Sequence, residues 1–266
     1  MTLLNISSKI EIYKLKNGEI MMISIINEYD NCGFCQLEFE FKGKKAIVIL
    51  PKNENKNGKA ILKTEYFGAF PGLQMEFVNQ GYTLLFLENR NRWGTDSELD
   101  DQYEFVKLVS KEFNLEPSVI TIGMSCGGLI SVKLCAKYPE IVKGLYLDAP
   151  VMNFLSCPAK FSNAPEVTEG MWHEFENAYG MTKTELLTYR EHPMDKVHIL
   201  IENKKPVYMV YGDSDLCVPY DENGISLEKQ YRKAGATLEI EVKKGCGHHP
   251  HGPGDYQRVI NFFEKN

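Results

Sequence analysis

Short apolar runs alternate with amphipathic segments along most of this 266-residue chain. Most of the runs are apolar at nearly every position, which is typical of strands that are buried on both faces of a parallel sheet. From residue 43 onward the pattern predicts strands at 44–51, 82–88, 118–123, 144–150, 206–212 and 236–245.

The segments between these runs carry the periodicity and the end signals of helices. Helices are predicted at 97–113, 126–138, 224–234 and 255–266. The first of them begins with Ser97 and Asp100 at the spacing of a capping box, and Pro139 and Gly235 stop the second and third. Strands that alternate with helices predict an α/β fold with a mostly parallel, doubly wound sheet.

Two regions depart from this alternation. Residues 1–42 contain alternating stretches with Asn-Gly and Lys-Gly turns, which predict antiparallel strands at the leading edge of the sheet. Residues 151–205 interrupt the pattern for much longer than a simple connection requires, and they contain Trp172 in a predicted helix. We interpret the chain as one domain, 1–266, with a small helical lid at about 151–205.

Composition excludes several classes of protein. The net charge is −6 and no long basic run is present, so nucleic acid and anionic membranes are not expected partners. The first residues lack a charged segment followed by an apolar core, and no apolar run approaches a membrane span. We therefore expect a cytoplasmic protein without a processed leader; the sequence gives no indication of its oligomeric state.

The cysteines favour free thiols in a reducing compartment. There are seven of them, an odd number, scattered over a long chain. Cys32 and Cys35 form a C-x-x-C pair, but no second pair completes four zinc ligands. We expect neither a metal nor an organic cofactor.

A G-x-S-x-G motif at 123–127 is the first candidate for chemistry. The motif alone is weak, but it directly follows a predicted strand and directly precedes a predicted helix, as a nucleophile elbow requires. Glycine at 123 and 127 would avoid collisions with neighbouring backbone at a strained turn. Ser125 is therefore the candidate nucleophile, and the alternative is a serine that only caps the helix.

A serine nucleophile needs a base and a group that orients the base. Asp215 is our candidate for the orienting acid, because it lies deep in the loop after the strand 206–212. Asp213, which could cap the turn locally, and Asp148, at the end of another strand, are the alternatives.

The candidate base lies in the histidine-rich stretch that follows the last predicted strand. His248 directly follows Gly247, with His249 as the next choice and His251 as a loop residue. A zinc site is a weaker interpretation, because these histidines lack helical i, i+4 spacing and a nearby acid.

The order Ser125, Asp215, His248 is the chain order of α/β-hydrolases. The chain resembles that superfamily from about residue 43 onward, and the segments that carry the resemblance are 65–72, 123–128, 147–150 and 247–251. In these segments it is similar to a bacterial esterase-like subgroup with a terminal GHHPH motif. The resemblance implies the α/β-hydrolase fold and the removal of acyl groups, in some members from carbohydrates.

The sequence departs from many lipases and esterases because it lacks their His-Gly-Gly-Gly oxyanion segment. One oxyanion donor should be the backbone N–H of Cys126, and the second should come from Tyr66 or Phe67. Candidate substrate-binding residues are Glu65, Trp93 and Trp172. Lys63 could also line the pocket, although a solvated charge is an equally good interpretation.

The function predicted from these residues is a serine hydrolase that cleaves a carboxylic ester through an acyl-enzyme. The substrate would be a small-molecule ester, including acylated carbohydrates. One alternative is an amidase, peptidase or acyltransferase on the same triad, because pocket and lid choose the acceptor. Another alternative is a ligand-binding protein with little turnover.

Overall fold

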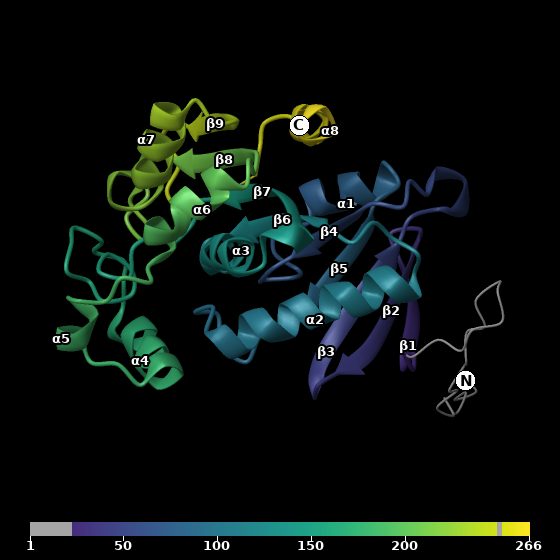
Figure 1. Cartoon of the computed structure of the whole chain (residues 1–266), viewed down its shortest axis with the longest axis horizontal. Helices are drawn as coiled ribbons and strands as arrows, with labels where there is room; N and C mark the ends of the chain where they lie inside the picture. Colours follow the sequence, from purple (N-terminus) through teal and green to yellow (C-terminus); the bar gives the residue numbers. More distant parts are fainter. Residues whose placement is uncertain (1–22, 249–251) are drawn as a thin grey trace, which may run out of the picture.

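The computed structural model of this protein describes residues 23–248 and 252–266. These residues build a nine-stranded sheet with the spatial order β1-β2-β3-β5-β4-β6-β7-β8-β9 (Figure 1). The strands are β1 (Asn27–Asn31), β2 (Phe34–Phe41), β3 (Lys44–Leu50), β4 (Ala60–Lys63), β5 (Thr83–Leu87), β6 (Val119–Met124), β7 (Val142–Asp148), β8 (Val207–Gly212) and β9 (Leu238–Lys243).

The direction of the strands divides the sheet into two parts. β1, β2 and β3 pair antiparallel with their neighbours, and β3 is also antiparallel to β5. All pairs from β5 to β9 are parallel. Every residue of β6 is buried, which explains why its sequence is a continuous apolar run. The predicted fold, a mostly parallel sheet that begins with antiparallel strands, is confirmed.

Helices cover both faces of the sheet. They are α1 (Gly72–Asn79), α2 (Asp96–Glu112), α3 (Cys126–Lys137), α4 (Glu169–Tyr179), α5 (Lys183–Leu186), α6 (Val197–Glu202), α7 (Gly224–Ala234) and α8 (Tyr256–Lys265). Apolar residues of α1 and α8 share one buried cluster, whereas those of α2, α3, α6 and α7 belong to the other. Across the part of the chain that the structure describes, no helix is long and apolar enough to cross a membrane.

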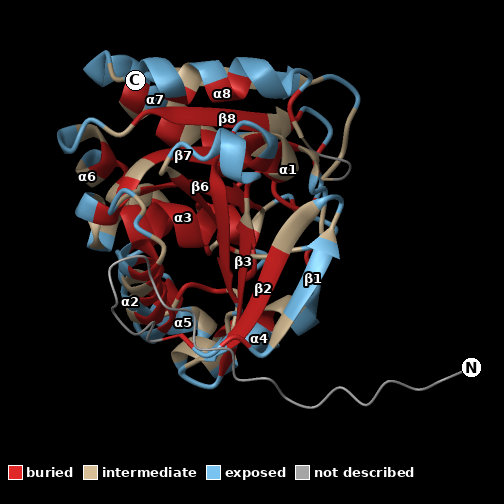
Figure 2. Cartoon of the chain, turned by 90° about the vertical axis from the view of Figure 1, so that its right-hand side faces the viewer, coloured by how far each residue is buried: buried red, intermediate tan, exposed pale blue. Residues whose placement is uncertain are grey.

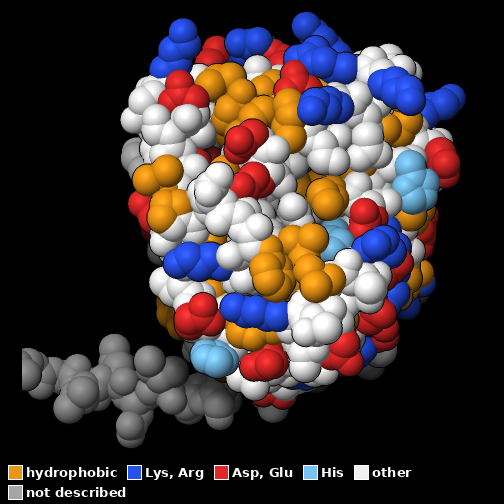
Figure 3. Space-filling view, turned by 90° about the vertical axis from the view of Figure 1, so that its left-hand side faces the viewer, with side chains coloured by type: hydrophobic (Ala, Val, Ile, Leu, Met, Phe, Trp, Pro, Cys, Tyr) orange, Lys and Arg blue, Asp and Glu red, His pale blue; other side chains and the backbone are white. Residues whose placement is uncertain are grey.

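The two clusters make the central strands the most buried part of the molecule, whereas β1 is largely exposed at the edge (Figure 2). β8 points toward the left in Figure 1, so the carboxyl ends of the parallel strands lie on that side. Figure 3 views this side directly, and hydrophobic side chains gather near its centre with charged side chains around them.

Two details of the sequence interpretation were wrong. No strand is predicted between 51 and 82, but the structure has β4 there, followed by α1. β4 was missed because it has only four residues and follows a strongly polar segment. The N-cap of α2 is Thr95 and not Ser97. The first part of the predicted N-terminal strands, residues 1–22, lies outside the described residues.

The predicted lid region, 151–205, contains α4, α5 and α6, and we call it the insertion. α4 packs on the main domain, because Phe175 meets Trp93 edge to face with ring centroids 5.6 Å apart. The Tyr179 hydroxyl donates to the carbonyl oxygen of Trp93 at 2.9 Å, and the Lys133 ammonium of α3 donates to that hydroxyl at 2.6 Å. The boundaries of a single domain with this insertion stay a prediction.

The antiparallel strands should depend on one aromatic contact with α2. The fully buried ring of Phe105 lies 6.1 Å from Phe39 and 5.8 Å from Phe41, centroid to centroid. Replacing a buried phenylalanine by alanine leaves a cavity, so Phe105→Ala should lower the free energy of unfolding by about 3–5 kcal/mol. Urea denaturation measures it. Phe161→Ala, at a residue that is 52% exposed, is the control and should change it by under about 0.5 kcal/mol. Equal effects would contradict this packing.

Candidate active site

Ser125 lies on a sharp turn between β6 and α3. Its backbone has φ 53° and ψ −117°, a conformation that L-residues rarely adopt. The residue occupies the N-cap position of α3, but its side chain makes no capping hydrogen bond. The alternative in which Ser125 only caps the helix is therefore not supported, and its hydroxyl group is available to another partner.

Glycine is required on both sides of this turn. A Cβ atom at Gly123 would lie 2.4 Å from the carbonyl oxygen of Gly127, and one at Gly128 would lie 2.6 Å from Cβ of Pro150. At Gly127 the nearest atom would be the Thr64 hydroxyl at 3.1 Å, a close contact without a backbone collision. The predicted collision is thus found at 123, is milder at 127, and was missed at 128.

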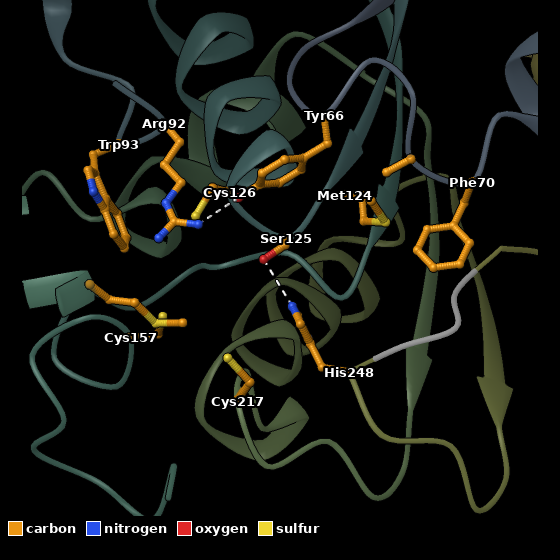
Figure 4. Close-up of a pocket in the computed structure, with 12 residues that line it drawn as sticks. Tyr66, Phe70, Arg92, Trp93, Met124, Ser125, Cys126, Cys157, Cys217 and His248 are labelled. Atoms are coloured by element: carbon orange, nitrogen blue, oxygen red, sulfur yellow. Dashed lines mark hydrogen bonds between the residues drawn. The ribbon is translucent and has the colours of Figure 1, made fainter. Parts of the chain in front are cut away.

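The structure brings the serine, the histidine and the acid together. Nε2 of His248 lies 3.0 Å from Oγ of Ser125, and its Nδ1 lies 2.7 Å from Oδ2 of Asp215 (Figure 4 shows the first contact). The other carboxylate oxygen of Asp215 accepts from the backbone N–H groups of Cys217 and Val218, at 2.9 and 2.8 Å. These bonds fix the carboxylate, which in turn fixes the imidazole.

The contact between His248 and Asp215 shifts the pKa of both groups. Burial lowers the pKa of the His248 imidazole, but the hydrogen bond and the charge of Asp215 outweigh it and leave this pKa above its usual value. Burial raises the pKa of Asp215, but its bonds to His248 and to the two backbone amides outweigh that effect and leave it low. The pair therefore favours a carboxylate beside an imidazole that readily accepts a proton.

The other acids have local partners. Asp213 accepts from the backbone N–H of Gly245 at 2.7 Å, which is the turn-capping role considered for it. Asp148 accepts from the Tyr146 hydroxyl at 3.1 Å. His249 and His251 lie outside the described residues. Among the residues that the structure does describe, no group of three or more His, Cys, Asp or Glu could hold a metal ion.

The two candidates for the second oxyanion donor face different ways. Tyr66 lines the cavity beside Ser125 and Cys126, and its hydroxyl accepts from Nη1 of Arg92 at 3.4 Å (Figure 4). The ring of Phe67 packs on Phe86, with centroids 5.0 Å apart, in the cluster on the other face of the sheet. Of the two side chains, only that of Tyr66 reaches the cavity.

Cys126 is the first residue of α3, so its N–H is among the helix donors that lack an intrahelical acceptor. Burial raises the pKa of its thiol to about 11, and the nearby Arg92 opposes this effect only in part. The thiol therefore stays protonated near neutral pH and is a poor nucleophile. This leaves the backbone as the chemically relevant part of the residue.

A cavity of about 500 Å³ opens beside Ser125 and His248. Its lining is mostly aromatic and sulfur-containing, and Arg92 carries its permanent charge. The remaining described residues that line it are Tyr66, Ala69, Phe70, Trp93, Met124, Cys126, Cys157, Met171 and Cys217. We call it the catalytic cavity; its chemistry suits an apolar group far better than a polar one.

Of the predicted substrate-binding residues, Trp93 lines the catalytic cavity, whereas Glu65 and Trp172 do not. Glu65 is turned toward Asn89, whose side-chain amide donates to it at 2.8 Å. Trp172 packs on Phe175 inside the insertion, with centroids 5.5 Å apart. Both side chains have local partners, and a linear sequence does not show which ones.

Several lining residues were not predicted. Arg92 directly precedes Trp93, so its neighbour gave a usable signal. Cys157 and Met171 come from the insertion and Cys217 from the loop after β8. No pattern in the sequence connects these segments, because only the folded chain brings them to one cavity.

The fold and the serine, histidine and acid at the carboxyl ends of its strands define an α/β-hydrolase. The model of the prolyl oligopeptidase family matches residues 80–266, more than half of the chain. The chain therefore belongs to the prolyl oligopeptidase family.

Solved structures share this fold at low identity. Acylaminoacyl peptidase from Pyrococcus horikoshii is 17% identical, with a TM-score of 0.67 over 87% of this chain and 41% of its own. Dipeptidyl peptidase 4 from Porphyromonas gingivalis is 14% identical, with a TM-score of 0.64 over 84% and 33%. The chain thus spans about two fifths or less of the length of these proteins. No curated protein matches its sequence.

The pH dependence of turnover should reveal the Asp215 contact. Wild-type kcat/KM should fall as the pH drops through the raised pKa of His248, because the protonated imidazole cannot accept the serine proton. Asp215→Asn removes the interactions that raise this pKa and leaves the burial that lowers it. The acidic limb should therefore move to lower pH, and kcat should fall roughly 10⁴-fold.

Asp213→Asn is the matched control, because Asp213 lies in the same loop and its carboxylate accepts from the Ser214 hydroxyl and from the backbone N–H of Gly245. It should retain the wild-type limb. An Asp215→Asn limb at the wild-type position would contradict the proposed coupling.

Proposed function

We propose that this protein is a serine hydrolase that cleaves an amide bond next to an apolar, uncharged acyl group. The observation that carries the proposal is the hydrogen-bonded series Ser125, His248, Asp215 at the edge of the apolar catalytic cavity. Membership of the prolyl oligopeptidase family supports the amidase or peptidase alternative over the ester as the principal substrate.

The reaction follows from the positions of three side chains. Nε2 of His248 takes the hydroxyl proton as Oγ of Ser125 attacks the acyl carbon, and Asp215 stabilises the resulting imidazolium. The imidazolium then gives its proton to the leaving nitrogen, and the C–N bond breaks. Water attacks the acyl-enzyme with His248 as base again, which releases the acid and returns the proton to Ser125.

Two hydrogen-bond donors on one side of Ser125 would stabilise the negative charge that develops on the acyl oxygen. The N–H of Cys126 lies at the positive end of the α3 dipole. The Tyr66 hydroxyl is the second donor in this proposal, because it lies at the catalytic cavity beside Ser125 and its oxygen accepts from Arg92. Preorganised donors in an apolar cavity stabilise the tetrahedral intermediate strongly.

The lining of the catalytic cavity limits which acyl groups can bind there. Among the described residues that line it, none is an Asp or a Glu, so a free α-ammonium group would find no counter-charge there. An acyl group whose nitrogen is blocked, or that has no amine, avoids this cost. Esters of the same acids should react through the same acyl-enzyme. A carbohydrate acyl substrate would place its acyl part, and not its sugar, among these apolar side chains.

The first test pairs a blocked and a free substrate. N-acetyl-phenylalanine p-nitroanilide should be cleaved at a higher kcat/KM than phenylalanine p-nitroanilide, because the free ammonium must be buried without a partner. Ser125→Ala should lower turnover of the blocked substrate by roughly 10⁴- to 10⁶-fold. Release of nitroaniline measures both effects.

Ser97→Ala, at an exposed serine of α2, is the control and should keep wild-type turnover. Intact-mass analysis after exposure to a fluorophosphonate should show one adduct on the wild type and on Ser97→Ala but none on Ser125→Ala. Tight binding of the substrate without turnover or labelling would instead favour the ligand-binding alternative.

A second test addresses the oxyanion. Tyr66→Phe removes the hydroxyl and keeps the ring, so kcat should fall roughly 10²- to 10³-fold while KM changes little. Phe67→Leu serves as the control because its ring lies in the opposite cluster. Steady-state kinetics on the blocked anilide separates kcat from KM. Loss of binding without loss of kcat in Tyr66→Phe would assign the tyrosine to substrate contact only.

A further inference from the structure

A second cavity, of about 280 Å³, lies beside the catalytic cavity. Phe70 and Met124 line both cavities, and Met124 directly precedes Ser125 in β6. In Figure 4 these two side chains lie on one side of Ser125, whereas Arg92, Trp93 and Cys157 lie on the other. The two cavities therefore flank the nucleophile.

The second cavity has buried polar and charged side chains among its apolar lining, whereas the lining of the first is almost entirely apolar apart from Arg92 and the catalytic groups. Its described lining includes Lys63, Gln74, Tyr146 and Asp148, and we call it the polar side cavity. The side chains of Lys63, Gln74 and Asp148 are nearly inaccessible, at 3%, 2% and 3% exposure. Buried polar groups of this kind cost free energy unless they are hydrogen-bonded, so each of them needs a partner.

One of these groups lacks its partner. Nε2 of Gln74 donates to the Phe67 carbonyl at 3.0 Å, but Oε1 has no hydrogen-bond partner among the described residues. The Lys63 ammonium has a long contact of 3.4 Å with the Ala69 carbonyl oxygen. Burial lowers the pKa of Lys63 to about 8, although the charge of Asp148 opposes this. The acceptor of Gln74 and the donor of Lys63 thus belong to two residues that line one cavity.

The geometry of acyl transfer indicates which part of the substrate would face the polar side cavity. In the tetrahedral intermediate the carbon holds Oγ of Ser125, the oxyanion, the acyl chain and the leaving group. The proposed oxyanion donors, Tyr66 and Cys126, take one direction, and the catalytic cavity takes the acyl chain. The side of Ser125 that remains is the side on which Met124 and Phe70 lie (Figure 4), and both residues also line the polar side cavity.

We propose that the polar side cavity receives the leaving group, and that this group is uncharged and carries both hydrogen-bond donors and acceptors. A carboxamide or neighbouring hydroxyl groups would fit: a donor for Oε1 of Gln74 and an acceptor for the Lys63 ammonium. Lys63 and Asp148 carry opposite charges at the same wall, which favours a neutral group over an anion or a cation. The inference rests on the proposed function, because it requires an acyl-enzyme at Ser125.

Acyl transfer from the acyl-enzyme to an added amine is the reverse of acyl-enzyme formation from an amide, so it tests whether the polar side cavity binds the leaving group. The amine nitrogen attacks the carbonyl carbon of the acyl-enzyme, a C–N bond forms, and the C–O bond to Oγ of Ser125 breaks. His248 takes one proton from the nitrogen and returns it to Oγ. The acceptor in this step occupies the leaving-group position, so the ratio of amide to hydrolysed product reports its binding there.

The experiment forms the acyl-enzyme from p-nitrophenyl hexanoate and compares alaninamide with n-butylamine, at equal concentrations of free base. The amide-to-acid ratio should be roughly fivefold lower in Gln74→Met and Lys63→Met than in wild type with alaninamide, the loss of about one hydrogen bond. With butylamine, which lacks the polar group, the ratio should change by less than about twofold. Lys56→Met, at an exposed lysine, should match wild type for both acceptors.

A second arm replaces the amines by glycerol and n-butanol, and loss of the glycerol ester in the two variants would assign hydroxyl groups as the recognised chemistry. Equal losses for polar and apolar acceptors, or no loss in either variant, would overturn the proposal. If a variant does not fold by thermal unfolding, wild type still decides, because it should prefer alaninamide over alanine, whose carboxylate is charged. Absence of a nitrophenol burst that depends on Ser125 would overturn the proposed function instead.

Discussion

The strained turn at Ser125 is the constraint on which the rest of the structure depends. Its N–H donates to the carbonyl oxygen of Asp148 at 2.8 Å, and its own carbonyl accepts from the N–H of Val151 at 3.1 Å. These bonds tie the elbow to the end of β7 and the first residue of the insertion. A conformation that costs free energy in isolation is therefore determined by the strand beside it.

The two backbone hydrogen bonds of Ser125 also hold neighbouring segments close to the turn, so there is little space around it. Gly123 and Gly128 leave room for backbone and for Pro150 where any Cβ would collide. Because β6 lies between β4 and β7, the loops after these strands meet at the same edge. Tyr66 follows β4, and the loop after β8 supplies Asp215, so these side chains approach Ser125 from the ends of different strands.

The two cavities beside Ser125 differ in the polarity of their lining. The catalytic cavity is lined by aromatic and sulfur-containing side chains, whereas the lining of the polar side cavity includes the buried residues Lys63, Gln74 and Asp148. The insertion contributes Cys157 and Met171 to the first, and its helix α4 binds Arg92 through Glu174 at 2.8 Å. An enzyme built in this way would separate the recognition of the acyl group from that of the leaving group, because each lies in a cavity of its own chemistry.

The sequence by itself determined the alternation of strands and helices, the place of the elbow and the order of Ser125, Asp215 and His248. These features depend on local patterns: apolar runs, helix stop signals and glycines around a serine. It did not reveal β4, whose four residues are too few for a periodic signal. Only the tertiary structure placed Tyr66 at the catalytic cavity and Phe67 in the opposite cluster, turned Glu65 and Trp172 away from the cavity, and brought Lys63 and Gln74 to a second one. These outcomes depend on contacts between segments far apart in the chain, which no local pattern records.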